Sequence, residues 1–220
     1  MIKFQNVSKY YDNQTVLRNV TLTIEQGEMV FITGPSGAGK STLLKLMYQA
    51  ERPDEGDITI GDFHLASLKE SMVPLLRRSI GVVFQDFKLI NNLTVFDNVA
   101  LALRIRGIKE KDVKALVSDS LKHVHLRHLS DSHPRSLSGG EQQRIVIARA
   151  IVAGPVVLLA DEPTGNLDPN TATDIIRLFR EINLGGTTIL IATHNRELFR
   201  NTGKRVLKLD GGNLIGDDID

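Results

Sequence analysis

Apolar and polar residues alternate along the first part of the chain. Residues 2–10 and 15–24 follow a period of two and together are rich in valine, isoleucine and threonine, which is typical of half-buried β-strands. The polar residues 12–14 between them predict a turn. The N-terminal part of the chain is therefore expected to form a pair of antiparallel strands.

Short continuous apolar runs occur farther along the chain. They are rich in β-branched residues, which indicates strands that are buried on both faces of a sheet. These runs occupy residues 29–33, 80–84, 156–160 and 187–193. Two shorter stretches on either side of Gly211-Gly212 predict a β-hairpin, and the acidic residues 216–220 after it are expected to fray.

Between residues 94 and 152 the strand pattern disappears. Apolar residues recur there every three or four positions, as in an amphipathic helix, and Thr94 and Ser138 stand where N-caps are expected. Helices are predicted at residues 94–106, 109–125 and 140–152. Helical patterns also follow residue 40 and occupy residues 67–78, which Pro74 could interrupt, and residues 171–182.

Strands and helices that alternate along a chain are typical of a sheet covered by helices. We therefore expect one α/β domain of residues 1–220. Its core would be built from residues 1–85 and 153–220, and the helical residues 86–152 would be inserted between these two parts.

The composition excludes several classes of function. The chain has 220 residues, a formal net charge of +1 and no cysteine, so neither a general affinity for nucleic acid nor a disulfide or thiol site is expected. No apolar stretch approaches the ~20 residues that cross a bilayer, and the N-terminus lacks the pattern of a signal peptide. The expected location is the cytoplasm, where only a partner could connect the chain to a membrane.

The apolar run at residues 29–33 leads into a glycine-rich loop that fits the pattern G-x-x-x-x-G-K-[ST], and a helical pattern follows at once. Glycines let successive N–H groups turn toward phosphate oxygens, and the helix N-terminus adds the positive end of its dipole. Lys40 can reach the β- and γ-phosphates, and the Ser41 hydroxyl can ligate Mg²⁺. A turn without a ligand is the simpler alternative. The loop consists of Gly34, Pro35, Ser36, Gly37, Ala38, Gly39, Lys40 and Ser41.

Polar side chains stand at the carboxyl ends of three other predicted strands. Gln85 follows the run at 80–84, and His194 follows the run at 187–193. The run at 156–160 ends in Asp161 and Glu162. Open α/β sheets bind ligands at this edge, so these ends are expected to converge on the γ-phosphate if the strands share one sheet. On this pattern alone, Gln85 could equally be an ordinary strand-end glutamine.

The two acidic residues are expected to do different work, because neighbouring side chains on a strand point to opposite faces. Asp161 can hold Mg²⁺ through its water shell, and Glu162 can orient and deprotonate an attacking water. Two carboxylates at the end of a buried strand are costly unless a cation or solvent compensates their charge. A site is therefore favoured over a purely structural role.

Two further features each have two interpretations. The ring of Tyr11, at the first turn, would either stack on an adenine or lie on the surface. Ser138, Gly139 and Gly140 precede a strong helical pattern, and they would form either a second anion site or an ordinary capped helix start.

The motifs, in this order and spacing, resemble those of ABC transporter ATPase subunits. The phosphate loop alone is shared by many NTPases, but the LSGGE segment at 137–141 and the Asp-Glu strand end make the resemblance specific, and it covers nearly the whole chain. It implies a P-loop NTPase core of the RecA type, an N-terminal antiparallel β-subdomain and an inserted helical subdomain. The EPTGNLD segment at 162–168 is similar to the subclass that serves cell division and the lipoprotein and macrolide exporters. Residues 84–89 and 94–100 look most like the bacterial cell-division ATPases.

The resemblance implies roles for residues around the nucleotide. Tyr11 would stack on adenine, and Thr42 would extend the phosphate loop. Gln85 would sense the γ-phosphate and Mg²⁺ and relay their state to a membrane partner. The catalytic set would be Lys40, Gln85, Glu162 and His194, and the Mg²⁺ set would be Ser41, Gln85 and Asp161.

The resemblance also implies a homodimer in which two ATP molecules are sandwiched between protomers. Ser138, Gly139 and Gly140 would bind the γ-phosphate of the other protomer's ATP, and Asp168 would lie at the dimer interface. The implied activity is Mg²⁺-dependent hydrolysis of ATP to ADP and phosphate.

The implied partner is an integral membrane protein of the FtsX type, which would hold the chain on the inner face of the membrane and control peptidoglycan hydrolysis. A lipoprotein or macrolide exporter subunit is the alternative with the same chemistry. A soluble ATPase acting on DNA or ribosomes fits less well, because the sequence has no coiled coil, zinc module or second cassette and a charge balance close to neutral. A non-catalytic scaffold that binds nucleotide would differ from all of these by showing no turnover.

Overall fold

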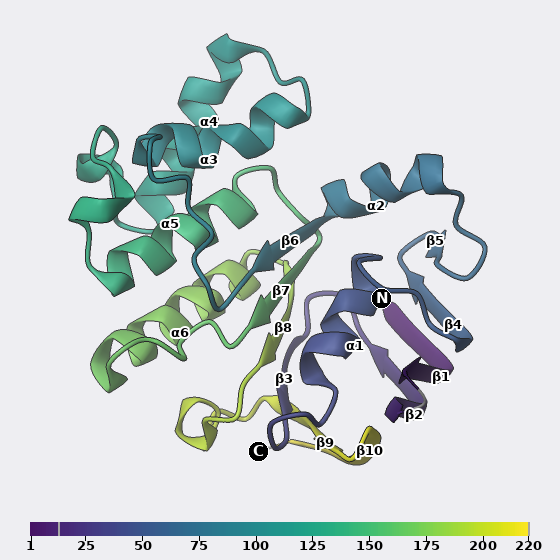
Figure 1. Cartoon of the computed structure of the whole chain (residues 1–220). Coiled ribbons are helices and arrows are strands. Elements are labelled where there is room, and N and C mark those ends of the chain that lie inside the picture. The colour runs from purple at the N-terminus through teal and green to yellow at the C-terminus, as the bar shows by residue number, and fades with distance from the viewer. Residues whose placement is uncertain (13, 220) are drawn as a thin grey trace.

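Two β-sheets form the framework of the molecule (Figure 1). It is a computed structural model that describes residues 1–12 and 14–219. Within these residues the smaller sheet is antiparallel, with the strand order β2-β1-β4-β5. The predicted N-terminal pair of strands is confirmed, although Asn13 of the predicted turn lies outside the described residues. The strands are β1 (Ile2–Tyr11), β2 (Gln14–Ile24), β4 (Glu55–Ile60) and β5 (Phe63–His64).

The larger sheet has the order β10-β9-β3-β8-β7-β6 in the described part of the chain. Its strands pair in parallel, except for the predicted hairpin of β9 and β10, which is antiparallel. The carboxyl ends of the parallel strands therefore lie along one edge. The strands are β3 (Met29–Thr33), β6 (Ile80–Val83), β7 (Val157–Asp161), β8 (Thr188–Ala192), β9 (Arg205–Asp210) and β10 (Asn213–Ile219).

Alternate residues of the central strands enter two separate cores. In β3, Val30 and Ile32 pack in the core that includes the smaller sheet and helix α1 (Lys40–Met47). Met29 and Phe31 pack in the core on the other face, among the remaining long helices. Burial on both faces explains why β3 and β8 are continuous apolar runs and do not alternate.

Helices cover the second face of the larger sheet and form a layer beyond its β6 edge (Figure 1). The predicted N-caps are confirmed: Thr94 accepts a hydrogen bond from the N–H of Asp97, and Ser138 accepts one from the N–H of Glu141. We call α3, α4 and α5 together the helical layer. The helices of this face are α3 (Val95–Ile105), α4 (Glu110–His123), α5 (Gly139–Ile151) and α6 (Pro169–Leu184).

Two expectations about local structure are wrong. The helix expected at residues 67–78 is shorter, because residues 67–69 are not helical and Glu70–Met72 form a 3₁₀ turn. Pro74 lies in the first turn of α2 (Val73–Ser79), where its missing N–H has no helical partner to lose. The acidic C-terminal residues do not fray as a whole, because β10 extends to Ile219. Arg205 holds them by donating hydrogen bonds of 2.6 and 2.7 Å to the carboxylate of Asp217.

Short 3₁₀ turns also lie between these elements, at Glu70–Met72, Arg127–Leu129, Pro134–Ser136 and Arg196–Leu198. Among the described residues, no helix combines the length and the apolar character needed to span a bilayer.

Candidate functional site

The glycine loop between β3 and α1 packs so closely against neighbouring backbone that two of its positions admit only glycine. A Cβ on Gly34 would stand 2.1 Å from the carbonyl oxygen of Leu209. A Cβ on Gly39 would stand 2.6 Å from the carbonyl oxygen of Val16, and the φ angle of Gly39 is +101°. The loop is therefore fixed in shape by the strands on either side of it.

Helix α1 begins without the side-chain cap that the other long helices of the site region have. Its N-cap is Gly39, and its first turn contains no acidic residue. By contrast, Ser138 caps α5 and Asp168 caps α6 with side-chain oxygens. The first turn of α1 thus has N–H groups with no side-chain acceptor at the cap, which is the arrangement that binds phosphate.

Lys40 lies over the loop that precedes it. Its side chain is buried, and Nζ donates hydrogen bonds to the carbonyl oxygens of Gly34 at 2.8 Å and Pro35 at 3.0 Å. The ammonium group is thereby held above the concave side of the loop, within reach of an anion bound there.

A cavity of about 900 Å³ opens at the loop. Most of the residues predicted for the nucleotide line it, and they come from both sheets and from the ends of separate strands. Two further lining residues, Gln14 and Val16, were not predicted, because nothing in an alternating strand marks which positions face a ligand. The lining consists of Tyr11, Gln14, Val16, residues 35–42, Gln85, Glu162 and His194.

The order of the parallel strands explains why these residues meet. Across the sheet the strands lie in the order β3, β8, β7 and β6. The carboxyl end of β3 leads into the phosphate loop, that of β8 into His194, that of β7 into the Asp161-Glu162 pair and that of β6 toward Gln85. Residues that lie far apart in the chain are therefore neighbours along one edge.

Asp161 and Ser41 form a pair of oxygen donors beside the phosphate loop. The Ser41 hydroxyl donates a hydrogen bond of 3.0 Å to Oδ1 of Asp161. Burial raises the pKa of Asp161 above its ordinary value, the hydrogen bond from Ser41 opposes this effect, and the nearby carboxylate of Glu162 adds to it. A half-buried carboxylate next to a hydroxyl is a donor set that fits a hard divalent cation such as Mg²⁺.

Glu162 contacts a different partner. Its Oε1 lies 2.9 Å from Nδ1 of His194, and its own N–H donates to the carbonyl oxygen of Ala192 at 2.9 Å. Its φ angle is +46°, in the left-handed region that is strained for a residue with a side chain. The Glu162 side chain is 14% exposed and that of His194 68% exposed, so the pair faces the cavity mouth.

Gln85 follows β6 and is exposed at the cavity. Its amide lies against Gly165 of the loop after Glu162, because a Cβ on Gly165 would stand 3.3 Å from Nε2 of Gln85. Tyr11 lies at the end of β1 on the other side, half-buried, with Nζ of Lys9 5.3 Å from the centre of its ring. Burial, followed by the charge of Glu51, raises the pKa of Tyr11.

The structure does not bring residues 138–140 to this cavity. Ser138, Gly139 and Gly140 form the start of α5, which has a capping box: the Ser138 hydroxyl accepts from the N–H of Glu141, and Oε2 of Glu141 accepts from the N–H of Ser138 at 2.8 Å. Gly140 has no room for a side chain, since a Cβ would stand 2.6 Å from Cγ2 of Thr171. Within one chain these residues are therefore a capped helix start. Asp168 likewise accepts from the N–H groups of Asn170 and Thr171 as the N-cap of α6.

Comparisons with known proteins show the family to which the chain belongs. The family model described as ABC transporter matches residues 17–165. The chain is 48% identical over 219 residues to the cell division ATP-binding protein FtsE of Bacillus subtilis, covering 99% of this chain and 96% of that protein. It is 49% identical over 217 residues to the protein of the same name from Escherichia coli, covering 98% of each.

A solved structure is also similar over its full length. It is a dimeric ATP-binding cassette in a post-hydrolysis state with bound ADP and Pi, with a TM-score of 0.89 and 35% identity, and the match covers 100% of this chain and 98% of that one. The predicted fold class, a P-loop NTPase core with ABC-type additions, is therefore confirmed.

Proposed function

This chain belongs to the ABC transporter family and is an ATPase, and we propose that it is the ATP-hydrolysing subunit of a bacterial cell-division complex. The observation that carries the proposal is that one cavity collects the phosphate loop with Ser41 and the Glu162–His194 pair, and that Asp161 is hydrogen-bonded to Ser41 beside it. The cell-division role is supported by the names of the relatives, which match nearly the whole chain.

The phosphate loop and Lys40 would bind the phosphates of ATP, and Tyr11 would stack on the adenine. Lys40 would exchange its contacts with the loop carbonyls for contacts with the β- and γ-phosphates, which are stronger because both groups are charged. Ser41, Asp161 and Gln85 would hold Mg²⁺, which when bound neutralises charge on the phosphate oxygens.

Glu162 would act as the general base. Its carboxylate would accept a proton from the attacking water as the water oxygen bonds to the γ-phosphorus. The bond from that phosphorus to the β–γ bridging oxygen then breaks, and ADP and phosphate result. His194, held by Oε1 of Glu162, would orient that carboxylate and contact the γ-phosphate.

The proposed working unit is a homodimer. Residues 138–140 do not line the cavity of their own chain, and they would instead contact the ATP of the second protomer. The dimeric state of the similar cassette supports this arrangement. In this proposal, residues 86–152 would form the helical subdomain that carries residues 138–140, and residues 1–85 and 153–220 would form the core.

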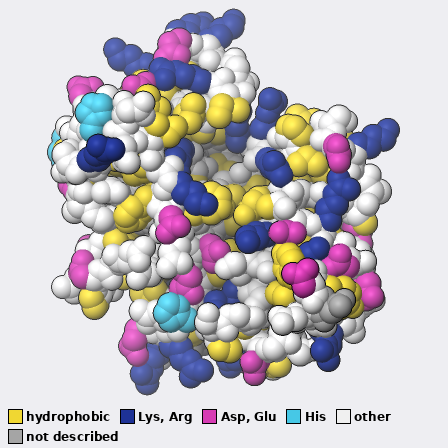
Figure 2. All heavy atoms as spheres, viewed as in Figure 1, with side chains coloured by type: hydrophobic (Ala, Val, Ile, Leu, Met, Phe, Trp, Pro, Cys, Tyr) yellow, Lys and Arg dark blue, Asp and Glu magenta, His cyan; other side chains and the backbone are white. Residues whose placement is uncertain are grey.

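The partner would be an integral membrane protein of the FtsX type, which would hold the ATPase at the inner face of the membrane and transmit its cycle to a peptidoglycan hydrolase. A surface for such a partner lies between α2 and the helical layer, where Figure 2 shows hydrophobic side chains around a hollow. A cavity of about 390 Å³ is present there, and Leu75 and Ile105 nearby are 43% and 71% exposed. Exposed apolar side chains around a hollow mark an interaction site.

The test is to purify tagged Glu162→Gln from detergent-solubilised membranes with Mg-ATP and to identify the co-purified protein. The variant should keep ATP bound and so retain the partner of the closed state. A small membrane protein of the FtsX type supports the proposal. An exporter permease would preserve the chemistry but refute the cell-division role, and recovery of nucleic acid or ribosomes alone would refute both the membrane partner and the role.

A further inference from the structure

The loop that follows Gln85 is attached to helix α5 by one long side chain. Arg149 lies near the end of α5, and its guanidinium donates hydrogen bonds to two successive carbonyl oxygens of the loop. Nη1 donates to Lys88 at 2.9 Å and Nη2 to Phe87 at 3.1 Å. Two nitrogens of one planar group thus fix two consecutive peptide units of the loop.

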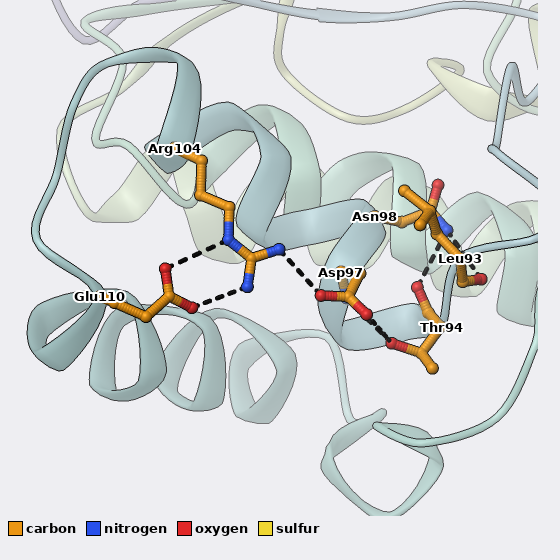
Figure 3. Close-up of polar contacts among 6 residues, drawn as sticks. All are labelled: Leu93, Thr94, Asp97, Asn98, Arg104 and Glu110. Atoms are coloured by element: carbon orange, nitrogen blue, oxygen red, sulfur yellow. Dashed lines mark hydrogen bonds and ion pairs between the residues drawn. The ribbon is translucent and has the colours of Figure 1, made fainter.

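The far end of the same loop is attached to helix α3. Asn98 is 0% exposed, and its Oδ1 accepts a hydrogen bond of 2.9 Å from the N–H of Ile90. Its Nδ2 lies within hydrogen-bond distance of the carbonyl oxygens of Ile90 at 3.0 Å, Leu93 at 3.3 Å and Thr94 at 2.9 Å. Figure 3 shows Asn98 pointing back from α3 toward Leu93 and Thr94. The backbone groups of this end are therefore satisfied by a buried side chain.

Apolar contacts reinforce both attachments. Phe87 and Leu89 pack against the core of the helical layer, although Gln85 and Asp86 just before them are exposed. The ring of Phe87 reaches the start of α5, because a Cβ on Gly139 would stand 3.8 Å from its Cζ. The loop therefore contacts both ends of helix α5, near Gly139 at its start and near Arg149 at its end.

The hydrogen-bond partners of Arg149 are both backbone carbonyl groups. It forms no ion pair with any residue that the structure describes, and burial lowers the pKa of its guanidinium. Keeping a half-buried cation without a carboxylate is costly. The hydrogen bonds that Arg149 donates offset part of this cost, because they give partners to two loop carbonyl groups outside any helix or strand.

We propose that Arg149 and Asn98 are positioning residues that make residues 87–93 a rigid part of the helical layer. The position of Gln85 at one nucleotide is then tied to that of Ser138, Gly139 and Gly140 at the start of α5. This inference rests on the proposed function, in which Gln85 contacts the nucleotide of its own chain and residues 138–140 contact the nucleotide of the second protomer. The two ATP sites of a dimer are coupled through this loop.

Gln85 and Asp86 are the part of the loop that these contacts with α3 and α5 do not include. Both are exposed, they lie between the end of β6 and the first attached carbonyl at Phe87, and neither is held by α3 or α5 through the contacts described above.

The experiment compares Arg149→Met, which keeps the stem but removes both donors, with Arg149→Lys, which keeps one donor. Arg104→Met is the matched control, because Arg104 lies on the exposed side of α3 and pairs with Asp97 and Glu110 without touching the loop (Figure 3). Circular dichroism melting first establishes that each variant is folded. Should Arg149→Met fail to fold, Arg149→Lys alone carries the comparison.

The first readout is cleavage after Lys88 by a lysine-specific protease in the absence of nucleotide. We expect Arg149→Met to be cleaved about 10-fold faster than the wild type, Arg149→Lys to be intermediate, and Arg104→Met to match the wild type. Equal cleavage rates at Lys88 in the wild type and Arg149→Met would overturn the claim that Arg149 holds the loop.

The second readout is steady-state ATP hydrolysis. We expect kcat of Arg149→Met to fall about 10-fold while KM for ATP stays within about twofold, because the phosphate loop is untouched and only positioning is lost. The Hill coefficient should fall toward 1, and Arg149→Lys should recover part of both losses. A rise in KM with unchanged kcat, or an unchanged Hill coefficient, would contradict the coupling.

The two hypotheses fail in different ways. If the wild type and Glu162→Gln hydrolyse ATP equally well, the proposed function of the site is wrong, and the protease comparison still decides whether Arg149 holds the loop. If Glu162→Gln is inactive but Arg149→Met is indistinguishable from the wild type, the site is correct and the positioning role is refuted.

Discussion

Ser41 and Asp161 are 120 positions apart in the chain, and the hydroxyl of the first donates a hydrogen bond of 3.0 Å to the carboxylate of the second. The bond joins the first turn of α1 to the end of β7. It brings a neutral and an anionic oxygen donor together beside the phosphate loop, and this geometry leads to the first of four predictions.

Replacing the Asp161 carboxylate by an amide should weaken the binding of Mg²⁺ at this site. In Asp161→Asn we expect the Mg²⁺ concentration for half-maximal ATPase activity to rise about 10-fold or more, because an anionic oxygen ligand is lost. A magnesium titration at saturating ATP measures the change. Asp174→Asn, on the exposed side of α6, is the control, and an unchanged titration in Asp161→Asn would exclude that residue from the cation site.

Glu162→Gln should separate chemistry from binding. The amide cannot accept a proton from water, so kcat should fall by about 100-fold or more, whereas ATP affinity should stay close to that of the wild type because the phosphate loop is unchanged. Single-turnover hydrolysis and equilibrium ATP binding measure the two quantities. Unchanged hydrolysis would show that another group is the base.

Lys40→Ala should weaken the binding of ATP, which Glu162→Gln should leave unchanged. Charged hydrogen bonds contribute about 1.5–3 kcal/mol, so ATP affinity is expected to weaken by about 10- to 100-fold. Equilibrium titration with a fluorescent ATP analogue is the measurement, and Lys111→Ala on the exposed face of α4 should bind as the wild type does. Normal affinity in Lys40→Ala would refute the assignment of the loop as the phosphate site.

The C-terminal strand provides a test of pH dependence. The hydrogen bonds from Arg205 hold the pKa of Asp217 below its ordinary value, so the pair stabilises the fold above the unfolded pKa of an aspartate and loses that contribution as the pH falls through the lowered pKa. Asp217 is 39% exposed, and water screens the pair. Asp217→Asn should therefore lower the free energy of unfolding at pH 7 by only about 0.5–1 kcal/mol.

The measurement for this pair is urea unfolding of the wild type and Asp217→Asn at several pH values. The difference between them should be constant near neutral pH and should shrink as the pH approaches 4 and falls below it. A difference that grows on acidification would show that the sign of the linkage is wrong.

The sequence by itself determined several local features of this protein. The glycine loop followed by Lys40 and Ser41, the N-caps Thr94 and Ser138, and the continuous apolar runs of β3 and β8 all depend on neighbours a few residues away. Spacing along the chain is enough to recognise them, because turns, caps and periodicity are short-range properties.

Tertiary structure alone decided which of these pieces meet. The strand order β3-β8-β7-β6 brings Lys40, His194, Glu162 and Gln85 to one edge, and no local pattern records that order. The attachment of the Gln85 loop by Arg149 was likewise not visible in the sequence, since an arginine on a helix reads as an exposed charge. Its donors find carbonyl groups about 60 positions away, and such contacts form only when the whole chain packs, because long-range pairing depends on the closure of the intervening chain.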